Sequence, residues 1–195
     1  MAEINPRKIK GVWTDGYALD LHSTKSVFLG HNEFGHPEFE THRTKIGELI
    51  YRLKYKTDET ALIEIGDVAE MFIRSWGIDT SLIVPVPPTA ARSIQPVFQI
   101  ADEIGARLQV PVAKTAIRKS KQIPELKNIY DFSERRLLLE DAFTVNTSMV
   151  ERQRILLVDD LYRSGATMSA VAEALRTAGA ATIFALALTQ TRKRA

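Results

Sequence analysis

The sequence predicts an α/β protein with a mostly parallel central sheet flanked by helices, and three observations lead to this prediction. Short apolar runs alternate with helix-length amphipathic segments over residues 81–189, as in chains that build parallel sheets. One run, residues 155–158 (ILLV), is apolar throughout, which is typical of a strand buried on both faces. The chain has 195 residues, of which 45% are hydrophobic and 26% charged, so it can bury the core of a globular domain.

Residues 1–42 are predicted to form a small β-rich N-terminal extension, and residues 43–195 the main domain. Asp15-Gly16, followed by an alternating segment, is typical of a hairpin turn. Residues 30–42 are polar and rich in turn formers, so we expect a loop there. Aromatic side chains of this region are expected to pack against the core; they are Trp13, Tyr17, Phe28 and Phe34.

Two amphipathic helices are predicted after the extension. Apolar residues recur with helical spacing from near Arg43, and again from Glu59 to Trp76. Gly77 then supplies a residue that readily adopts the left-handed conformation in which helices end. The remaining predicted elements are a strand at 81–86, a helix at 97–108, a strand at 110–117 confined to an edge by Pro111, strands at 142–145 and 155–158, a helix at 170–178 and a strand at 182–189.

Two adjacent aspartates, Asp159 and Asp160, directly follow the predicted strand at residues 155–158. Ligands of open α/β sheets bind at the carboxyl ends of the strands, so these acids are candidate site residues. A short turn before a helix comes next, and it contains Arg163, Ser164, Gly165, Ala166 and Thr167. Backbone amides in such a turn, helped by the helix dipole and the two hydroxyls, can hold a phosphate.

The neighbouring carboxylates are repelled by a phosphate, but they can accept hydrogen bonds from a sugar diol. The segment therefore fits a ribose 5-phosphate. The turn would hold the phosphate, while Asp159 and Asp160 would hold the 2- and 3-hydroxyls. A strand followed by an N-capped helix with solvated acids is the alternative interpretation.

Residues 155–167, ILLVDDLYRSGAT, resemble the phosphoribosyl-pyrophosphate loop of type I phosphoribosyltransferases. The sequence departs from that pattern at Arg163, where a small residue is usual. The stretches LIVPVPPTAARSIQPVFQIADEI, IRKSKQIPELKNIYDFSERR and DAFTV resemble the ComF/GntX-type branch of this family, which includes competence-associated members. The resemblance runs from about Lys54 to Thr189. The N-terminal cysteine zinc module of that branch is missing, since the chain has no cysteine.

This resemblance implies a type I phosphoribosyltransferase (Rossmann-like) fold for residues 43–195, with a flexible hood loop at about 118–136. It implies an enzyme that binds phosphoribosyl pyrophosphate and transfers the phosphoribosyl group to a nitrogenous base or amine, releasing pyrophosphate. Mg²⁺ would be held mainly by the substrate diphosphate and water, with no protein ligand assigned. Arg92, in the loop after the strand at 81–86, would contact pyrophosphate, and Lys121 of the hood would close over it.

Asp159 and Asp160 would then be the catalytic residues, and one of them could also serve as general base toward the acceptor. The resemblance leaves open a second interpretation, a regulatory or competence-associated protein that binds phosphoribosyl pyrophosphate without turnover. A sugar-phosphate hydrolase is less favoured, because no nucleophile is apparent. The resemblance also leaves open a homodimer.

Composition argues against several other classes. The formal net charge is +2 and no basic, aromatic stripe is evident, so nucleic acid is not expected as a direct ligand. No signal peptide or membrane-spanning run is apparent, and a cytoplasmic protein is expected. Four histidines match no zinc-ligand spacing and are expected to be surface or hydrogen-bonded residues: His22, His31, His36 and His42.

Overall fold

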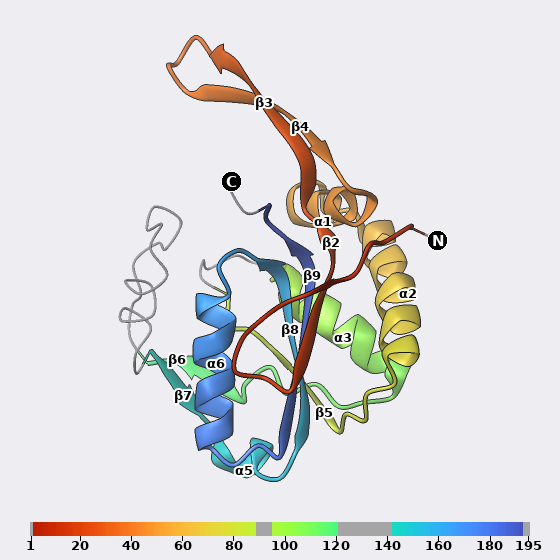
Figure 1. The fold of residues 1–195 in the computed structure, drawn as a ribbon, viewed down its shortest axis with the longest axis vertical. Helices are drawn as coiled ribbons and strands as arrows, with labels where there is room; N and C mark the ends of the chain where they lie inside the picture. The colour runs from red at the N-terminus through yellow and green to blue at the C-terminus, as the bar shows by residue number, and fades with distance from the viewer. Residues whose placement is uncertain (1, 89–94, 121–141, 193–195) are drawn as a thin grey trace.

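A computed structural model describes residues 2–88, 95–120 and 142–192 (Figure 1). At its centre is a five-stranded sheet in the order β1-β2-β9-β8-β5. The strands are β1 (Arg7–Lys8), β2 (Asp15–Leu21), β5 (Leu82–Pro85), β8 (Arg154–Tyr162) and β9 (Thr182–Gln190). Neighbouring strands are parallel except β1, which is antiparallel to β2. The predicted α/β fold with a mostly parallel sheet is confirmed.

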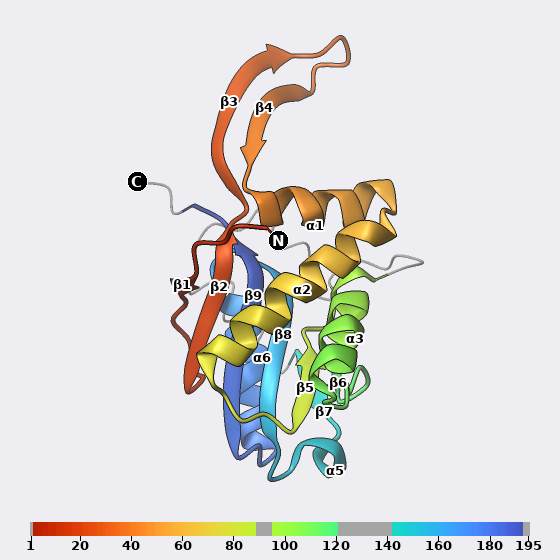
Figure 2. The same cartoon turned by 90° about the vertical axis from the view of Figure 1, so that its right-hand side faces the viewer.

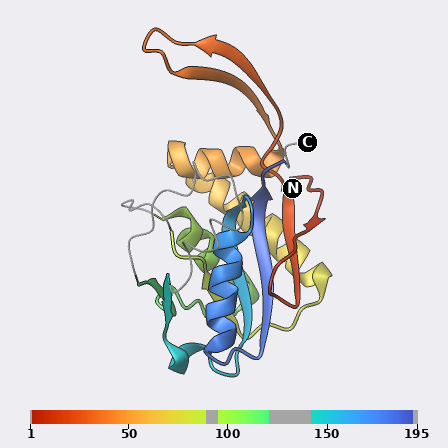
Figure 3. The ribbon, with the colours of Figure 1, turned by 60° about the vertical axis from the view of Figure 1, so that its left-hand side comes forward.

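Helices cover both faces of this sheet (Figures 1, 2 and 3). They are α1 (Lys45–Lys56), α2 (Glu59–Trp76), α3 (Pro96–Leu108), α5 (Thr147–Val150) and α6 (Ala166–Thr177). Leu156 and Val158 of β8 pack with α1, α2 and α3, whereas Ile155 and Leu157 pack with α6. All four side chains are fully buried, and the burial of each contributes about 1.5–3 kcal/mol to the free energy of unfolding. The run ILLV is apolar throughout because its alternate side chains pack into the hydrophobic cores on the two faces of the sheet.

Local signals fix the ends of α1 and α2. Thr44 accepts a 3.1 Å hydrogen bond from the amide of Gly47, and Asp58 caps α2 in the same way. Gly77 ends α2 in the left-handed conformation, with φ 70°. The helix predicted from Glu59 to Trp76 is confirmed at both ends. Within the described ranges, no helix is long and apolar enough to cross a lipid bilayer.

The hairpin turn predicted at Asp15-Gly16 is wrong. These two residues begin β2, which pairs in parallel with β9 inside the central sheet. The Trp13 ring lies against Gly16, where a Cβ atom would be 2.4 Å from Trp13 Nε1. Glycine is needed here for close packing rather than for a turn. β1 and β2, which belong to the predicted N-terminal extension, are therefore strands of the central sheet.

The loop predicted at residues 30–42 is also wrong. An antiparallel hairpin of β3 (Ser23–His31) and β4 (Pro37–Arg43) projects from the body there (Figures 1 and 2). We call residues 23–43 the arm. Both faces of the arm are largely exposed, so its sequence lacks the apolar–polar alternation of a half-buried strand.

The aromatic residues of the N-terminal region divide into two groups. Trp13 and Tyr17 pack against the two sides of the core, as predicted. Phe28 and Phe34 do not, because they lie on the arm and are 51% and 76% exposed. The prediction of core packing is wrong for this second pair.

A second small hairpin lies beside α6 (Figure 1). It consists of β6 (Ile117–Lys119) and β7 (Phe143–Val145), paired antiparallel. The predicted hood loop at about 118–136 therefore starts within β6, and its part beyond residue 120 lies outside the described residues. The edge strand predicted at 110–117 is reduced to one parallel bridge, between Val112 and Ile83 of β5.

Candidate ligand-binding site

Asp159 and Asp160 lie inside β8, which continues to Tyr162, at the carboxyl end of the parallel sheet. Successive side chains of a strand point to opposite faces of the sheet. Asp160 therefore follows Val158 onto the face covered by α1, α2 and α3, and Asp159 follows Leu157 onto the face covered by α6. The two neighbouring carboxyl groups therefore lie on opposite faces of the sheet, one toward each layer of helices.

Asp160 forms an ion pair with Lys54 of α1, a residue that the sequence analysis did not assign to the site. Lys54 Nζ lies 2.5 Å from Asp160 Oδ2, and the two side chains are 17% and 20% exposed. A pair so shielded from water interacts more strongly than an exposed one. The contact holds α1 over the carboxyl end of the sheet. No sequence signal identified it, because Lys54 and Asp160 are far apart in the chain and further lysines surround Lys54.

The pKa of Asp159 is raised to about 8, chiefly by burial and secondarily by the negative charge of Asp160. Backbone amides of Asp160 and Leu161 and the charge of Lys54 oppose this rise in part. The Asp160 amide donates a 2.8 Å hydrogen bond to Asp159 Oδ1. At neutral pH the acid pair therefore carries close to one negative charge, which explains how two adjacent acids are tolerated.

Asp159→Asn is expected to stabilise the protein near pH 8 and to change little near pH 4. The native state keeps Asp159 protonated up to about pH 8, whereas an unfolded chain ionises aspartate near pH 4. The native state thus binds an extra proton in this window, and stability falls as pH rises through it. Asparagine removes that loss, which we expect to be about 1–2 kcal/mol, or about 2–8 °C in melting temperature. Melting curves at both pH values test this, and an equal gain at both would contradict it.

The turn after β8 has a geometry suited to an anion. Gly165 is the N-cap of α6 with φ 79°, and a Cβ atom there would be 2.4 Å from the hydroxyl of Tyr162. That hydroxyl donates a 2.9 Å hydrogen bond to the carbonyl of Lys10, which fixes the ring beside the turn. The amide of Ala166 donates a long 3.4 Å bond to the Ser164 hydroxyl. First-turn amides have no intrahelical partner, and they lie at the positive end of the helix dipole.

Residues of the N-terminal region border the same edge of the sheet. His22, directly after β2, has its Nδ1 3.2 Å from Thr189 Oγ1, which donates to the Asp160 carbonyl at 3.0 Å. Burial lowers the pKa of His22, and the charges of Lys54 and Arg43 lower it further. His22 is therefore a neutral, hydrogen-bonded residue near pH 7. Among the described residues, no group of three or more His, Asp or Glu is arranged to hold a metal ion.

The structure brings the predicted acids and the predicted phosphate turn together at one end of the sheet. The turn residues are at the start of α6, with the Gly165 and Ala166 positions buried and the Arg163 side chain exposed. The carbonyl of Arg163 accepts a 3.3 Å hydrogen bond from Thr191 Oγ1, which follows β9. Arg92 and Lys121, which we expect to contact pyrophosphate, lie outside the described residues.

Comparison with known proteins places the chain in a family. Residues 55–195 match the family described as Phosphoribosyl transferase domain. The chain is similar to the competence protein ComFC of Bacillus subtilis (strain 168), with 26% identity over 142 residues. The match covers 72% of this chain and 58% of ComFC, so the chain spans less than two thirds of that relative's length.

Two solved structures share the fold at low sequence identity. Adenine phosphoribosyltransferase from Trypanosoma brucei is 14% identical, with a TM-score of 0.51 over 94% of this chain and 74% of that one. Glutamine phosphoribosylpyrophosphate amidotransferase from B. subtilis is 15% identical, with a TM-score of 0.50 over 80% of this chain and 34% of that one. The family match shows that the chain belongs to the type I phosphoribosyltransferase family, and the similarity to ComFC supports its ComF-like branch.

Proposed function

We propose that this protein binds phosphoribosyl pyrophosphate and transfers its phosphoribosyl group to a nitrogenous base or amine. The observation that carries the proposal is the placement of the acid pair beside the glycine turn, at the carboxyl end of β8. The first-turn amides of α6 and the hydroxyls of Ser164 and Thr167 would hold the 5-phosphate. Asp159 and Asp160 would accept hydrogen bonds from the ribose hydroxyls. Arg163 would add a positive charge beside the phosphate.

In the transfer, the bond from the anomeric carbon to pyrophosphate breaks, a bond from that carbon to the acceptor nitrogen forms, and the nitrogen loses a proton. Asp159 is the better candidate for accepting that proton, because a pKa of about 8 suits a general base near neutral pH. Its carboxyl also faces α6, on whose side the phosphate turn begins. Water must be kept out while positive charge develops on the sugar, which is the role we propose for the hood.

Mg²⁺ belongs to this proposal as a partner of the substrate. Magnesium prefers oxygen ligands and keeps several waters, so diphosphate oxygens can supply most of its coordination. The carboxylates of Asp159 and Asp160 suit contact through bound water, and the ion would neutralise charge on the leaving group. We propose the same neutralising role for Arg92 and Lys121.

The proposal is tested by incubating the protein with Mg²⁺, phosphoribosyl pyrophosphate and a panel of nitrogenous bases and amines, while pyrophosphate release is followed. Calorimetry without any acceptor measures binding separately. Release that depends on one acceptor supports transfer. Absence of binding would refute the proposed site.

The similarity to ComFC favours a second candidate, a protein that binds phosphoribosyl pyrophosphate without turnover in a process linked to competence. Tight binding of phosphoribosyl pyrophosphate, combined with no pyrophosphate release under any acceptor, would favour this candidate over the transferase.

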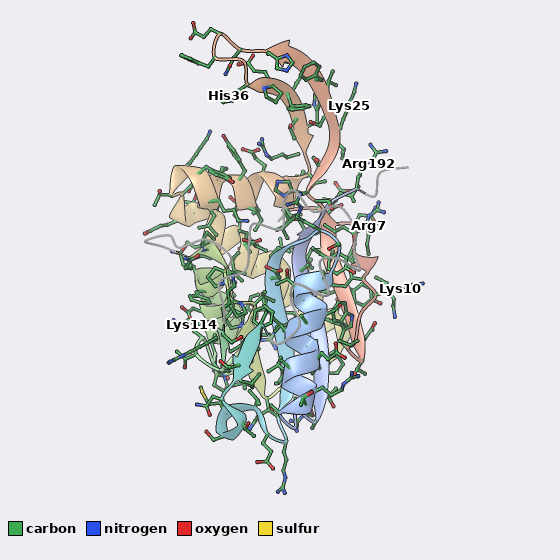
Figure 4. All side chains as sticks on the ribbon, turned by 90° about the vertical axis from the view of Figure 1, so that its left-hand side faces the viewer. Arg7, Lys10, Lys25, His36, Lys114 and Arg192 are labelled. Atoms are coloured by element: carbon green, nitrogen blue, oxygen red, sulfur yellow. The ribbon has the colours of Figure 1, made fainter. Side chains whose placement is uncertain are left out.

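Lys54→Met is expected to weaken phosphoribosyl-pyrophosphate binding about tenfold. Without the ammonium group, Asp160 would present an uncompensated negative charge to the polyanionic ligand. Calorimetry on the two proteins measures the difference in affinity. Lys114→Met is the matched control, because Lys114 pairs with Asp102 at 2.9 Å on the body (Figure 4) and its loss should leave affinity unchanged. Unchanged affinity in Lys54→Met would show that the ion pair does not support ligand binding.

A further inference from the structure

The segment that connects β1 to β2 lies on the face of the sheet that α6 covers (Figure 1). We call this segment, residues 9–14, the strap. Ile9 is buried in the core on that face, and Trp13 packs against the same core. The amide of Thr14 donates a 2.8 Å hydrogen bond to the carbonyl of Ile183 in β9. The strap is therefore part of the packed body of the protein.

Trp13 fixes the shape of the strap. Its Nε1 donates a 3.2 Å hydrogen bond to the carbonyl of Ile9, which closes the segment around the indole ring. Gly11 and Gly16 lie directly against that ring, and a Cβ atom at either position would overlap it. Larger side chains are therefore excluded at both positions. The backbone of the strap is folded closely around one aromatic side chain.

Two contacts join the strap to Tyr162, which ends β8 immediately before the phosphate turn. The Tyr162 hydroxyl donates a 2.9 Å hydrogen bond to the carbonyl of Lys10, whose side chain points away from the body (Figure 4). The Trp13 ring meets the Tyr162 ring edge-on, with centroids 6.4 Å apart and an angle of 77° between the planes. Burial raises the pKa of the Tyr162 hydroxyl, so the group stays protonated and able to donate this bond near neutral pH.

The strap orients the side chain of Tyr162, because the backbone of this residue is already held by β9. Tyr162 is paired with Gln190 at the end of β9, and the amide of Thr191 donates a 3.0 Å hydrogen bond to the Tyr162 carbonyl. These backbone contacts fix the main chain but do not choose the rotamer of the ring. The hydrogen bond to Lys10 and the contact with Trp13 select one orientation of the ring.

The orientation of the Tyr162 ring matters for the phosphate turn. The ring lies so close to Gly165 that a Cβ atom there would be 2.6 Å from two ring atoms. Gly165 has φ 79°, and its carbonyl accepts a 2.8 Å hydrogen bond from the amide of Ser169 in α6. A ring held in this place limits the backbone movement of Gly165. Gly165 in turn sets the direction of the first amides of α6, which have no intrahelical partner.

We propose that the strap positions the phosphate turn, with Trp13 and the Lys10 carbonyl holding the Tyr162 ring and the ring holding Gly165. Trp13, Lys10 and Tyr162 are positioning residues, because they act on the ligand through the turn. The proposal rests on the proposed function, which assigns the 5-phosphate to this turn. It adds two residues that precede residues 55–195, the part of the chain that matches the family.

The first test needs no ligand and measures hydrogen exchange in the free protein. Tyr162→Phe keeps the ring and removes the hydrogen bond to Lys10. The Ser169 amide, whose hydrogen bond closes the first turn of α6, should then exchange at least about fivefold faster. The Ala178 amide, at the other end of α6, should exchange at its original rate. Unchanged exchange at Ser169, or equal acceleration of both amides, would overturn the proposal.

Tyr17→Phe is the matched control, because it deletes the same hydroxyl group on the opposite face of the sheet. Tyr17 packs there against Phe72 and Trp76 of α2, with ring centroids 5.4 and 5.1 Å away. This variant should leave both the exchange of Ser169 and the ligand affinity unchanged. A control that accelerates Ser169 as much as Tyr162→Phe does would contradict the proposal.

The second test measures the affinity for phosphoribosyl pyrophosphate in the presence of Mg²⁺ by calorimetry. Tyr162→Phe should weaken binding about fivefold. Trp13→Leu, which removes the ring contact and the hydrogen bond to Ile9, should weaken binding at least as much. The double variant should bind about as well as the Trp13→Leu protein, because both substitutions act through the Tyr162 ring. Unchanged affinity in Tyr162→Phe, or losses that multiply in full in the double variant, would overturn the proposal.

Failure of the proposed function would give a different result. An unmodified protein that does not bind phosphoribosyl pyrophosphate would refute the proposed ligand site, whereas hydrogen exchange at Ser169 would still decide whether the strap holds the turn. Normal binding by the unmodified protein, with Tyr162→Phe indistinguishable from it in both tests, would refute the role of the strap alone.

Discussion

Replacing Gly165 with valine is expected to abolish binding of phosphoribosyl pyrophosphate, a loss of at least about a hundredfold in affinity. Gly165 has φ 79°, and a Cβ atom there would lie 2.4 Å from the Tyr162 hydroxyl and 2.6 Å from two atoms of its ring. Tyr162 cannot swing aside freely, since its hydroxyl is bonded to the carbonyl of Lys10. The turn would have to open, and its amides would lose their alignment. We also expect a loss of about 2–4 kcal/mol in stability.

Gly35→Val is the control that separates the backbone strain of a left-handed valine from a steric clash with Tyr162. Gly35 has φ 75°, close to that of Gly165, but nothing lies within 4 Å of the Cβ position. This control should show the strain of a left-handed valine alone and should keep full affinity. Calorimetry gives the affinity and thermal melting gives the stability of each variant. A folded Gly165→Val protein that binds with normal affinity would show that the turn does not hold the phosphate.

Replacing Asp159 and Asp160 together with asparagine is expected to reduce affinity for phosphoribosyl pyrophosphate about a hundredfold or more while the fold stays intact. The acid pair would otherwise accept hydrogen bonds from the two ribose hydroxyls, and the bond to its charged member is worth about 1.5–3 kcal/mol. Stability should not fall sharply, because the repulsion between two adjacent acids is removed while Lys54 loses its partner.

Asp79→Asn is the matched control for the double variant. Asp79 pairs with Arg154 at 3.0 Å, at the opposite end of the same strand β8. The substitution therefore removes a carboxylate that pairs with the other end of β8, away from the proposed site. Calorimetry on both proteins, with circular dichroism to check the fold, gives the comparison. Unchanged affinity in the double variant would show that the two acids do not contribute to ligand binding.

The parts of the fold that were predictable depend on short-range signals. The strand ILLV, the acids after it and the turn around Gly165 are contiguous, so their chemistry can be inferred from neighbouring residues alone. The helix from Glu59 to Trp76 was predictable because its apolar period, the cap at Asp58 and the stop at Gly77 all agree.

The features that were missed depend on long-range contacts or on exposure. The ion pair of Lys54 with Asp160 joins α1 to β8, and no local pattern signals such a contact. Asp15-Gly16 has the sequence of a turn, but pairing with β9 and packing of Trp13 override that local preference. The arm was not predicted, because a hairpin exposed on both faces lacks the apolar–polar alternation by which half-buried strands are recognised in a sequence.

The fold begins before residue 55, because β2 is one of its inner strands. β2 precedes residues 55–195, the part that matches the family, yet it is an inner strand of the sheet, between β1 and β9. Cutting the chain at that limit would leave β9 with a bare row of amide and carbonyl groups, which is a template for uncontrolled association between chains. Residues 7–21 are thus as much a part of the folding unit as the phosphate turn is, and a shortened version that omits them should precipitate rather than fold.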